Sequence, residues 1–208
     1  MSHYKSNGKL LLTGEYLVLK GATALALPLK LGQSLDVVTS DKDENRIYWN
    51  TFLKSTDNGQ QTTDIMHRLQ PWFSVVLDKT DFSVIETDDK EKAERLSNIL
   101  SKVKSLNDDV FNDSYDYRFS TLLDFDPQWG LGSSSTLINN VSEWANINPY
   151  LLLDSTFKGS GYDIACAKAD GPIFYSCQRS AIGSQPLSTA VSFNPEYVSL
   201  VYLEVLAH

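Results

Sequence analysis

A glycine–serine segment, Gly130-Leu131-Gly132-Ser133-Ser134-Ser135, separates a predicted strand from a predicted helix. The strand-like stretch covers residues 119–125 and is stopped by Asp126-Pro127. The helix follows at once, and its apolar residues form one stripe made of Leu137, Ile138, Val141, Trp144 and Ala145. The segment therefore joins a strand to the N-terminus of a helix.

Such a segment suits the binding of a phosphate. Backbone N–H groups in the first turn of a helix lack partners, and the helix dipole favours an anion there. Glycines allow close approach, and serine hydroxyls can bond a phosphate oxygen or Mg²⁺. The sequence has no G-x-x-x-x-G-K-[ST] loop, and serine at position 135 replaces the third glycine of G-x-G-x-x-G. A serine-rich helix cap after a turn explains the segment equally well.

Composition excludes several function classes. The formal net charge is −8, and the whole acidic excess lies between Asp36 and Asp126. Binding to a nucleic-acid backbone depends on clustered Lys and Arg, so we expect no nucleic-acid partner, and we find no polybasic membrane patch. No apolar run approaches the roughly 18 residues of a membrane span. We therefore expect a protein that binds neither nucleic acid nor a membrane.

The cysteines and histidines indicate the compartment and the chemistry. Cys166 and Cys177 form no C-x-x-C pair, and such sparse usage fits a reducing cytosol better than a disulfide scaffold. His3, His67 and His208 have no zinc-ligand spacing. We expect a cytoplasmic protein without a zinc site of this kind.

Three charged residues are candidates for a functional site, each with an ordinary alternative. Asp163 follows Gly159-Ser160-Gly161, and it could cap a helix or accept a proton from a hydroxyl group. Lys9 begins an apolar strand over residues 9–13, where a lysine either stays at the surface or reaches a polar site. Glu15 has the same two interpretations.

The rest of the chain contains predicted strands and two further helices. Strands are expected over residues 22–29, 34–39, 47–53 and 173–177, with an apolar extended segment over 16–19. The pattern Asp88-x-x-Glu91 is typical of a capping box, and it predicts a helix with a solvent face of Lys90, Lys92 and Glu94 and an apolar face of Ala93, Leu96, Ile99, Leu100, Val103 and Leu106. Asn148-Pro149 predicts the start of a short helix that ends near Phe157.

Three segments taken together are more specific than any one of them. They are Ser6-Asn7-Gly8-Lys9-Leu10-Leu11-Leu12-Thr13-Gly14-Glu15-Tyr16-Leu17-Val18-Leu19-Lys20-Gly21, Gly130-Leu131-Gly132-Ser133-Ser134, and Ser160-Gly161-Tyr162-Asp163-Ile164-Ala165. In this order they resemble the motifs of the GHMP small-molecule kinases, a superfamily that includes mevalonate kinase, phosphomevalonate kinase, homoserine kinase and galactokinase. The string Gly-Tyr-Asp-Ile-Ala suggests a subgroup close to the mevalonate enzymes. The resemblance is dense over residues 6–36 and 119–177 and weak between them.

The resemblance implies a fold and a division into domains. The expected fold class is α+β, with an N-terminal ATP-binding domain of the ribosomal protein S5 domain 2 type over residues 1–185. A ferredoxin-like second domain would begin at residues 186–208.

The resemblance also implies roles for individual residues. ATP and Mg²⁺ are the expected cofactors, with Ser134 approaching the metal ion. Asp163 would accept the proton of the substrate hydroxyl, and Lys9 would lie within charge-pairing distance of Asp163 and neutralise the transferring phosphoryl group. The expected nucleotide-binding residues are Gly130, Leu131, Gly132, Ser133, Ser134 and Ser135, and the expected substrate-binding residues are Glu15, Tyr16, Ser160 and Gly161.

The sequence departs from the family pattern in three places. Only Gln128 and Trp129 separate Pro127 from Gly130, which makes this approach to the loop one residue shorter and bulkier than usual. The glutamate that helps to bind Mg²⁺ in mevalonate enzymes has no counterpart in register, since Asp154 is the only nearby acid. The family's third, glycine-rich motif is not reached before His208.

The expected function is ATP-dependent phosphorylation of a small acidic metabolite, with mevalonate or phosphomevalonate as the leading acceptors in the isoprenoid precursor pathway. The alternatives are an inactive or incomplete nucleotide-binding fragment and a kinase of another branch, such as homoserine kinase. Because residues 198–206 are almost wholly apolar, we expect a C-terminally truncated chain with little activity that can self-associate through this strand.

Overall fold

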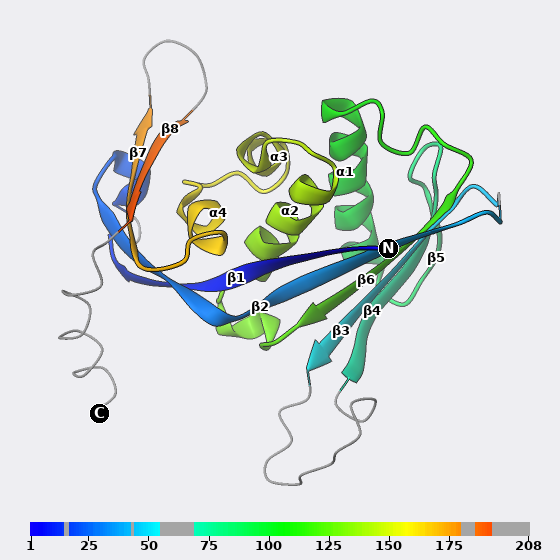
Figure 1. Cartoon of the computed structure of the whole chain (residues 1–208), viewed down its shortest axis with the longest axis horizontal. Coiled ribbons are helices and arrows are strands. Elements are labelled where there is room, and N and C mark those ends of the chain that lie inside the picture. Colours follow the sequence, from blue (N-terminus) through cyan, green and yellow to red (C-terminus); the bar gives the residue numbers. More distant parts are fainter. Residues whose placement is uncertain (15–16, 43, 55–68, 180–185, 193–208) are drawn as a thin grey trace, which may run out of the picture.

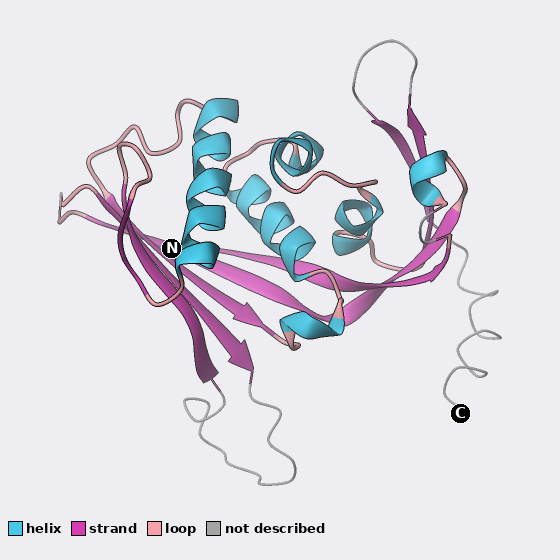
Figure 2. Ribbon diagram, turned by 180° about the vertical axis from the view of Figure 1, so that it is seen from behind, coloured by secondary structure: helices cyan, strands magenta, loops and turns pink. Residues whose placement is uncertain are grey.

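The computed structural model describes residues 1–208 except 15–16, 43, 55–68, 180–185 and 193–208. Its described part is a mixed sheet with helices against one face (Figures 1 and 2). The strands are β1 (Ser2–Thr13), β2 (Ala24–Ser40), β3 (Arg46–Lys54), β4 (Leu69–Asp78), β5 (Val84–Thr87), β6 (Asp116–Leu123), β7 (Ile173–Arg179) and β8 (Pro186–Ser192). The helices are α1 (Lys90–Leu106), α2 (Ser133–Trp144), α3 (Pro149–Thr156) and α4 (Tyr162–Ala167), with 3₁₀ turns η1 (Val18–Lys20) and η3 (Pro127–Trp129). The expectation of a fold that mixes sheet and helices is confirmed.

The long strand β2 organises the sheet. The strand order is β5-β4-β3-β6-β2-β7-β8, and β1 pairs separately with β2. The second half of β2 pairs with β6, while its first residues, Ala24 to Ala26, pair with β7. Only β3 and β6 run parallel to each other, and the other described pairs are antiparallel. Strand β2 therefore connects the N-terminal strand β1 to the region of α4 and β7.

The core lies between the sheet and the helices. Helix α1 buries Ala93, Leu96, Ile99, Leu100 and Val103, as its sequence pattern predicts, and α2 buries Ile138 and Val141 from its predicted stripe. On the sheet, the Trp49 ring stacks on Phe119 with centroids 4.8 Å apart, and Trp144 of α2 meets Phe119 edge-on at 4.9 Å. These aromatic contacts hold α2 against the middle of the sheet.

Of the two predicted helix N-caps, one is confirmed and the other lies one residue further along the chain. Asn148 caps α3 as expected, since its side chain accepts from the Tyr150 amide. Helix α1 begins one residue later than predicted, because Asp89 accepts from the Lys92 amide while Asp88 accepts from the amide and hydroxyl of Ser74. The strand pairing of β4 and β5 brings Ser74 to Asp88, and this contact is not visible in the local pattern.

Several predicted strands also change their bounds. The expected strands over 22–29 and 34–39 are one continuous strand, β2, and the expected strand over 9–13 extends back to Ser2. The apolar segment over 16–19 is not extended where it is described, because residues 18–20 form η1. Strands β4 and β5 are missing from the prediction.

The expected domain boundary at residue 185 stays a prediction. β8 lies beyond it and pairs with β7 in the same sheet. Residues 193–208, which include the apolar segment proposed for self-association, lie outside the described residues. None of the described helices is long and apolar enough to cross a bilayer.

Candidate functional site

The glycine–serine segment forms a left-handed turn that leads into α2. Gly130 has φ 71° and Gly132 has φ 90°, conformations that favour glycine. Gly132 is the N-cap of α2, and it provides no side chain to cap the first turn. The interpretation of a serine cap is therefore wrong, and the amides of the first turn are left without a side-chain acceptor from the N-cap.

A buried polar network fixes α2 against β1 and β2. Ser6 donates to the Asn140 side chain over 2.7 Å, and Asn140 donates to the backbone carbonyl of Gln33 over 2.9 Å. Thr136 donates to the Gln33 side chain over 2.7 Å. Because each of these groups is buried, the loss of one partner would leave another unsatisfied, which makes the position of α2 specific.

Strand β1 runs directly against the loop at Gly8 and Lys9. The Lys9 amide donates to the Leu131 carbonyl over 2.9 Å. A Cβ on Gly8 would come within 2.9 Å of the Leu31 carbonyl oxygen and 3.2 Å of that of Leu131. The N-terminal motif and the loop motif, which are more than 100 residues apart in sequence, are therefore in contact.

Asp163 lies in the first turn of α4, and its carboxylate faces the start of α2. Its Oδ2 atom accepts from the Ser135 hydroxyl over 2.5 Å, and its Oδ1 atom accepts from the Ile164 amide over 3.2 Å. The N-cap of α4 is Gly161, with φ 82°, so Asp163 is not the cap residue. The Asp163 carboxylate is therefore directed at the loop motif, where it meets Ser135.

Gly161 fixes the start of α4. A Cβ at this position would lie 2.9 Å from Cε1 of Tyr150 and 3.1 Å from the Tyr175 hydroxyl. The Tyr175 hydroxyl donates to the carbonyl of Ser160, which is itself buried. The structure shows Ser160 and Gly161 packed against other protein groups. The expected role of these two residues in substrate binding stays a prediction.

Lys9 reaches the same region but does not pair with Asp163. Its ammonium donates to the Tyr162 hydroxyl over 2.5 Å and lies 4.9 Å from the centre of that ring. Among the described residues, no ion pair forms between Lys9 and Asp163, so this part of the sequence prediction is wrong. The cause is helix geometry: adjacent positions on α4 point about 100° apart, so Tyr162 meets Lys9 while Asp163 meets Ser135.

Cys166 lies one turn further along α4, and it is a free, fully buried thiol. Burial raises the pKa of the Cys166 thiol to about 12, while the charge of Lys9 acts to lower this pKa and that of Asp163 acts to raise it. Both charged groups are thus close enough to influence the same sulfur. The three motifs expected to form a site meet around the first turn of α4.

The raised pKa of Cys166 predicts an unreactive thiol. In a Cys177→Ser variant, alkylation at pH 8 is expected to be about 10²-fold or more slower in the native protein than in denaturant, because the thiolate is scarce and covered. The measurement is the rate of iodoacetamide labelling by mass spectrometry. A Cys166→Ser variant serves as the control for the other thiol, and equal native and denatured rates would contradict the prediction.

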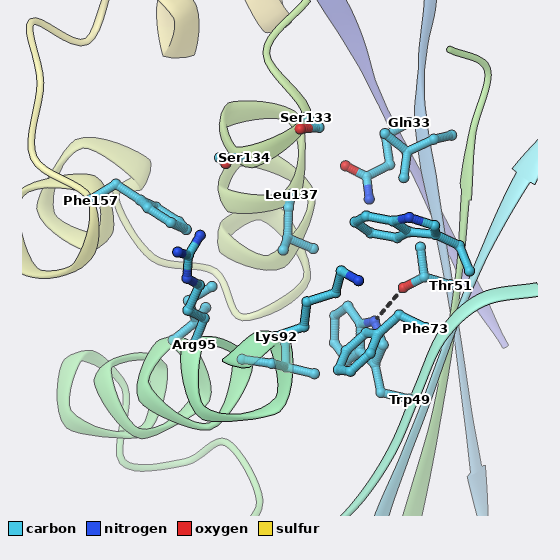
Figure 3. Close-up of a pocket in the computed structure, with 14 residues that line it drawn as sticks. Gln33, Trp49, Thr51, Phe73, Lys92, Arg95, Ser133, Ser134, Leu137 and Phe157 are labelled. Atoms are coloured by element: carbon cyan, nitrogen blue, oxygen red, sulfur yellow. Dashed lines mark hydrogen bonds between the residues drawn. The ribbon is translucent and has the colours of Figure 1, made fainter. Parts of the chain in front are cut away.

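A pocket of about 140 Å³ opens beside the first turn of α2 (Figure 3). Ser133, Ser134 and Leu137 line it from α2, while Lys92 and Arg95 line it from α1. The other lining residues are mainly aromatic or aliphatic: Gln33, Trp49, Thr51, Trp72, Phe73, Leu96, Ile99, Leu123 and Phe157. The pocket therefore combines an apolar floor with two cations and the start of a helix.

Sequence reasoning missed this pocket and misread one of its residues. Lys92 was expected in solvent; its side chain is 34% exposed, its ammonium pairs with Asp89 over 2.6 Å, and it lies 4.5 Å from the centre of the Trp72 ring. Trp72 belongs to β4, a strand absent from the prediction, so no sequence signal connected it with α1. Two further predicted residues, Glu15 and Tyr16, lie outside the described residues.

The fold matches solved structures of several small-molecule kinases. The chain is 14% identical to mevalonate kinase from Methanococcus jannaschii, with a TM-score of 0.61, and the match covers 94% of this chain and 57% of that one. It is 17% identical to phosphomevalonate kinase from Streptococcus pneumoniae, solved with phosphomevalonate and AMPPNP, with a TM-score of 0.55 and coverage of 98% and 53%. For galactokinase from Lactococcus lactis, solved with galactose, the identity is 12%, the TM-score 0.52 and the coverage 92% and 47%.

These similarities show that the chain shares its fold with the matched part of these structures. The chain spans about half the length of the structures that it matches. No protein-family model and no curated protein sequence matches it.

Proposed function

We propose that this chain is the nucleotide-binding part of an ATP-dependent small-molecule kinase of the GHMP type. The observation that carries the proposal is the hydrogen bond from Ser135 to Asp163, which joins the predicted phosphate loop to the predicted proton acceptor. If Ser135 and Asp163 served only as local helix caps, this contact between two motifs 28 positions apart in sequence would not be expected. The kinase folds of the matched structures support the same conclusion.

The nucleotide phosphates would bind at the first turn of α2. The glycine turn leaves the amides of this turn without a side-chain cap, and the helix dipole favours the phosphate charge. The nucleotide base would lie in the neighbouring pocket, where aromatic side chains such as Trp72 offer a stacking surface. Lys92 and Arg95 would then face the ribose or the phosphates from α1.

Ser134 is the residue that would hold Mg²⁺. Its side chain is exposed, and no hydrogen bond from it to another described residue is present. The described residues contain no cluster of three or more acidic, histidine or cysteine ligands, so the ion would take most of its ligands from phosphate and water, as Mg²⁺ commonly does. When bound, Mg²⁺ neutralises charge on the transferring phosphoryl group.

Asp163 would orient the acceptor hydroxyl and take its proton. The Ser135 hydroxyl and the Ile164 amide both donate to its carboxylate, and these two hydrogen bonds hold the carboxylate beside the start of α2. Lys9, whose ammonium meets Tyr162 at the start of α4, would stabilise the charge that develops on the phosphoryl group. Transfer of this kind needs positioning and charge stabilisation more than covalent chemistry.

The acceptor is proposed to be a small acidic metabolite, with mevalonate or phosphomevalonate as the first compounds to test. Matched structures include kinases for both, and also a galactokinase. The experiment is an assay of ADP release with mevalonate, phosphomevalonate, homoserine and galactose. Nucleotide binding without ADP release from any of them would favour the alternative of a binding fragment, and absence of nucleotide binding would overturn the proposal.

Ser134→Ala tests the metal assignment. We expect it to weaken binding of Mg-ATP about tenfold, roughly the effect of one hydrogen bond or ligand to a charged group, while binding of metal-free ATP changes less. Calorimetric titration with and without Mg²⁺ measures both. Ser155→Ala, on α3, is the matched control, since its hydroxyl donates within that helix. Equal losses with and without metal would place the Ser134 hydroxyl away from the ion.

A further inference from the structure

Lys9 is held at three points between the loop motif and α4. Its amide donates to the Leu131 carbonyl over 2.9 Å, and its Cγ lies 3.1 Å from where a Cβ on Gly132 would be. Its ammonium donates to the Tyr162 hydroxyl over 2.5 Å and lies 4.9 Å from the ring centre. The backbone of the lysine is thus fixed by the loop, its stem passes close to Gly132, and its charged end is fixed by Tyr162.

Tyr162 is itself held by its neighbours. It is the first residue of α4, where Gly161 sets the start of the helix. Its ring meets the ring of Tyr175 edge-on, with centroids 6.5 Å apart, and Tyr175 is fully buried. A side chain placed in this way can act as a rigid support for a flexible cation.

We infer that Tyr162 is the positioning residue for Lys9, an inference that rests on the proposed kinase function. Lysine has a long, flexible stem, so an unsupported ammonium would sample many positions. The hydroxyl and ring of Tyr162 together restrict it to the space between Gly132, the N-cap of α2, and Tyr162, the first residue of α4, next to the proposed phosphate site. Tyr162 acts through Lys9 and not on the reacting atoms.

A kinetic double-mutant cycle tests the inference. Tyr162→Phe keeps the ring but removes the hydroxyl, and we expect kcat to fall about tenfold while the KM for ATP changes less than twofold. Tyr162→Leu removes both contacts and should lower kcat further. Lys9→Met is expected to lower kcat by about 10²- to 10³-fold. In the Lys9→Met background, Tyr162→Phe should have no further effect on kcat, because Tyr162 acts only by positioning the Lys9 ammonium, which this variant lacks.

Tyr48 provides a matched control on another part of the sheet. Its hydroxyl donates to Glu44 over 2.7 Å, and Arg118 lies 4.4 Å from its ring centre, so this tyrosine also combines a hydroxyl hydrogen bond with a cation near its ring, but away from Lys9. Tyr48→Phe is expected to leave kcat unchanged. Losses that multiply in the Tyr162→Phe, Lys9→Met double variant, or full activity of Tyr162→Phe alone, would overturn the inference.

A spectroscopic measurement separates this inference from the proposed function. With ¹³C-labelled lysine, the Hε signals of Lys9, assigned through Lys9→Arg, should be displaced from those of the solvent-exposed lysines by the ring of Tyr162. The shift should persist in Tyr162→Phe and disappear in Tyr162→Leu. Absence of the shift in the unaltered chain overturns the positioning of Lys9, whether or not the protein is a kinase. If the Lys9 signals are displaced as expected but the chain releases no ADP, the proposed function is contradicted and the contact between Lys9 and Tyr162 is supported.

Discussion

Asp163→Asn is expected to lower kcat by about 10²- to 10⁴-fold, the range typical of a positioned acid–base group. Asparagine keeps nearly the same shape and can still accept from the Ser135 hydroxyl, but it cannot take a proton from the acceptor. The nucleotide affinity should stay the same, because the proposed phosphate contacts come from the first turn of α2. Steady-state kinetics with the acceptor found by the ADP-release assay, together with a nucleotide titration, measure both quantities.

Asp154→Asn is the control for this result. Asp154 is an exposed acid on α3, so its replacement should change neither turnover nor affinity. If Asp163→Asn retained turnover within a few-fold of the unaltered protein, Asp163 would not be the proton acceptor. If it lost nucleotide affinity together with turnover, the carboxylate would instead support the structure of the loop.

Gly32→Ala is expected to destabilise the protein by about 3 kcal/mol, at the upper end of the usual range for overpacking. A Cβ at this position would lie 2.2 Å from the backbone carbonyl oxygen of Ser6, so β1 and β2 would have to separate. The same strand pair carries Lys9 and fixes α2 through Gln33, so the fold and the site depend on this contact.

Urea unfolding of Gly32→Ala and Gly171→Ala provides the comparison. No atom lies within 4 Å of a Cβ built on Gly171, so its replacement should change the free energy of unfolding by less than about 1 kcal/mol. Similar midpoints for the two variants would show that β1 can shift away from β2 without loss of packing.

Helices α1, α2 and α3 could be predicted because their signals are local, whereas the short helix α4 was not predicted. The apolar stripe of α2 and the cap of α3 depend on residues within one or two turns, and both are present in the structure. The same method missed the polar face of α2, where Asn139 and Asn140 are buried. Their partners, the Ile164 carbonyl, Ser6 and Gln33, come from other elements, and no local pattern specifies such partners.

The candidate site, like the fold, could be predicted from the sequence only in part. The positions of Lys9, Asp163 and the glycine–serine loop could be singled out from the sequence, and the structure brings all three segments to one end of α4. The roles of Ser135 and Tyr162 as hydrogen-bond partners could not, because serine and tyrosine are common in turns and cores. The pocket beside α2 was also missed, since its lining comes from several elements and Trp72 and Phe73 belong to β4, a strand absent from the prediction.

The sequence by itself determined the local conformations: glycines at 130, 132 and 161 that allow a left-handed backbone, and the helix α2 that begins directly after Gly132. Only the tertiary structure decided which side chains meet. The contact between Lys9 and Tyr162 joins residues 153 positions apart, and it depends on the register of β1 on β2 and on the packing of α2 and α4. Backbone conformation is set mainly by neighbouring residues, whereas a long-range contact depends on every element between its two ends.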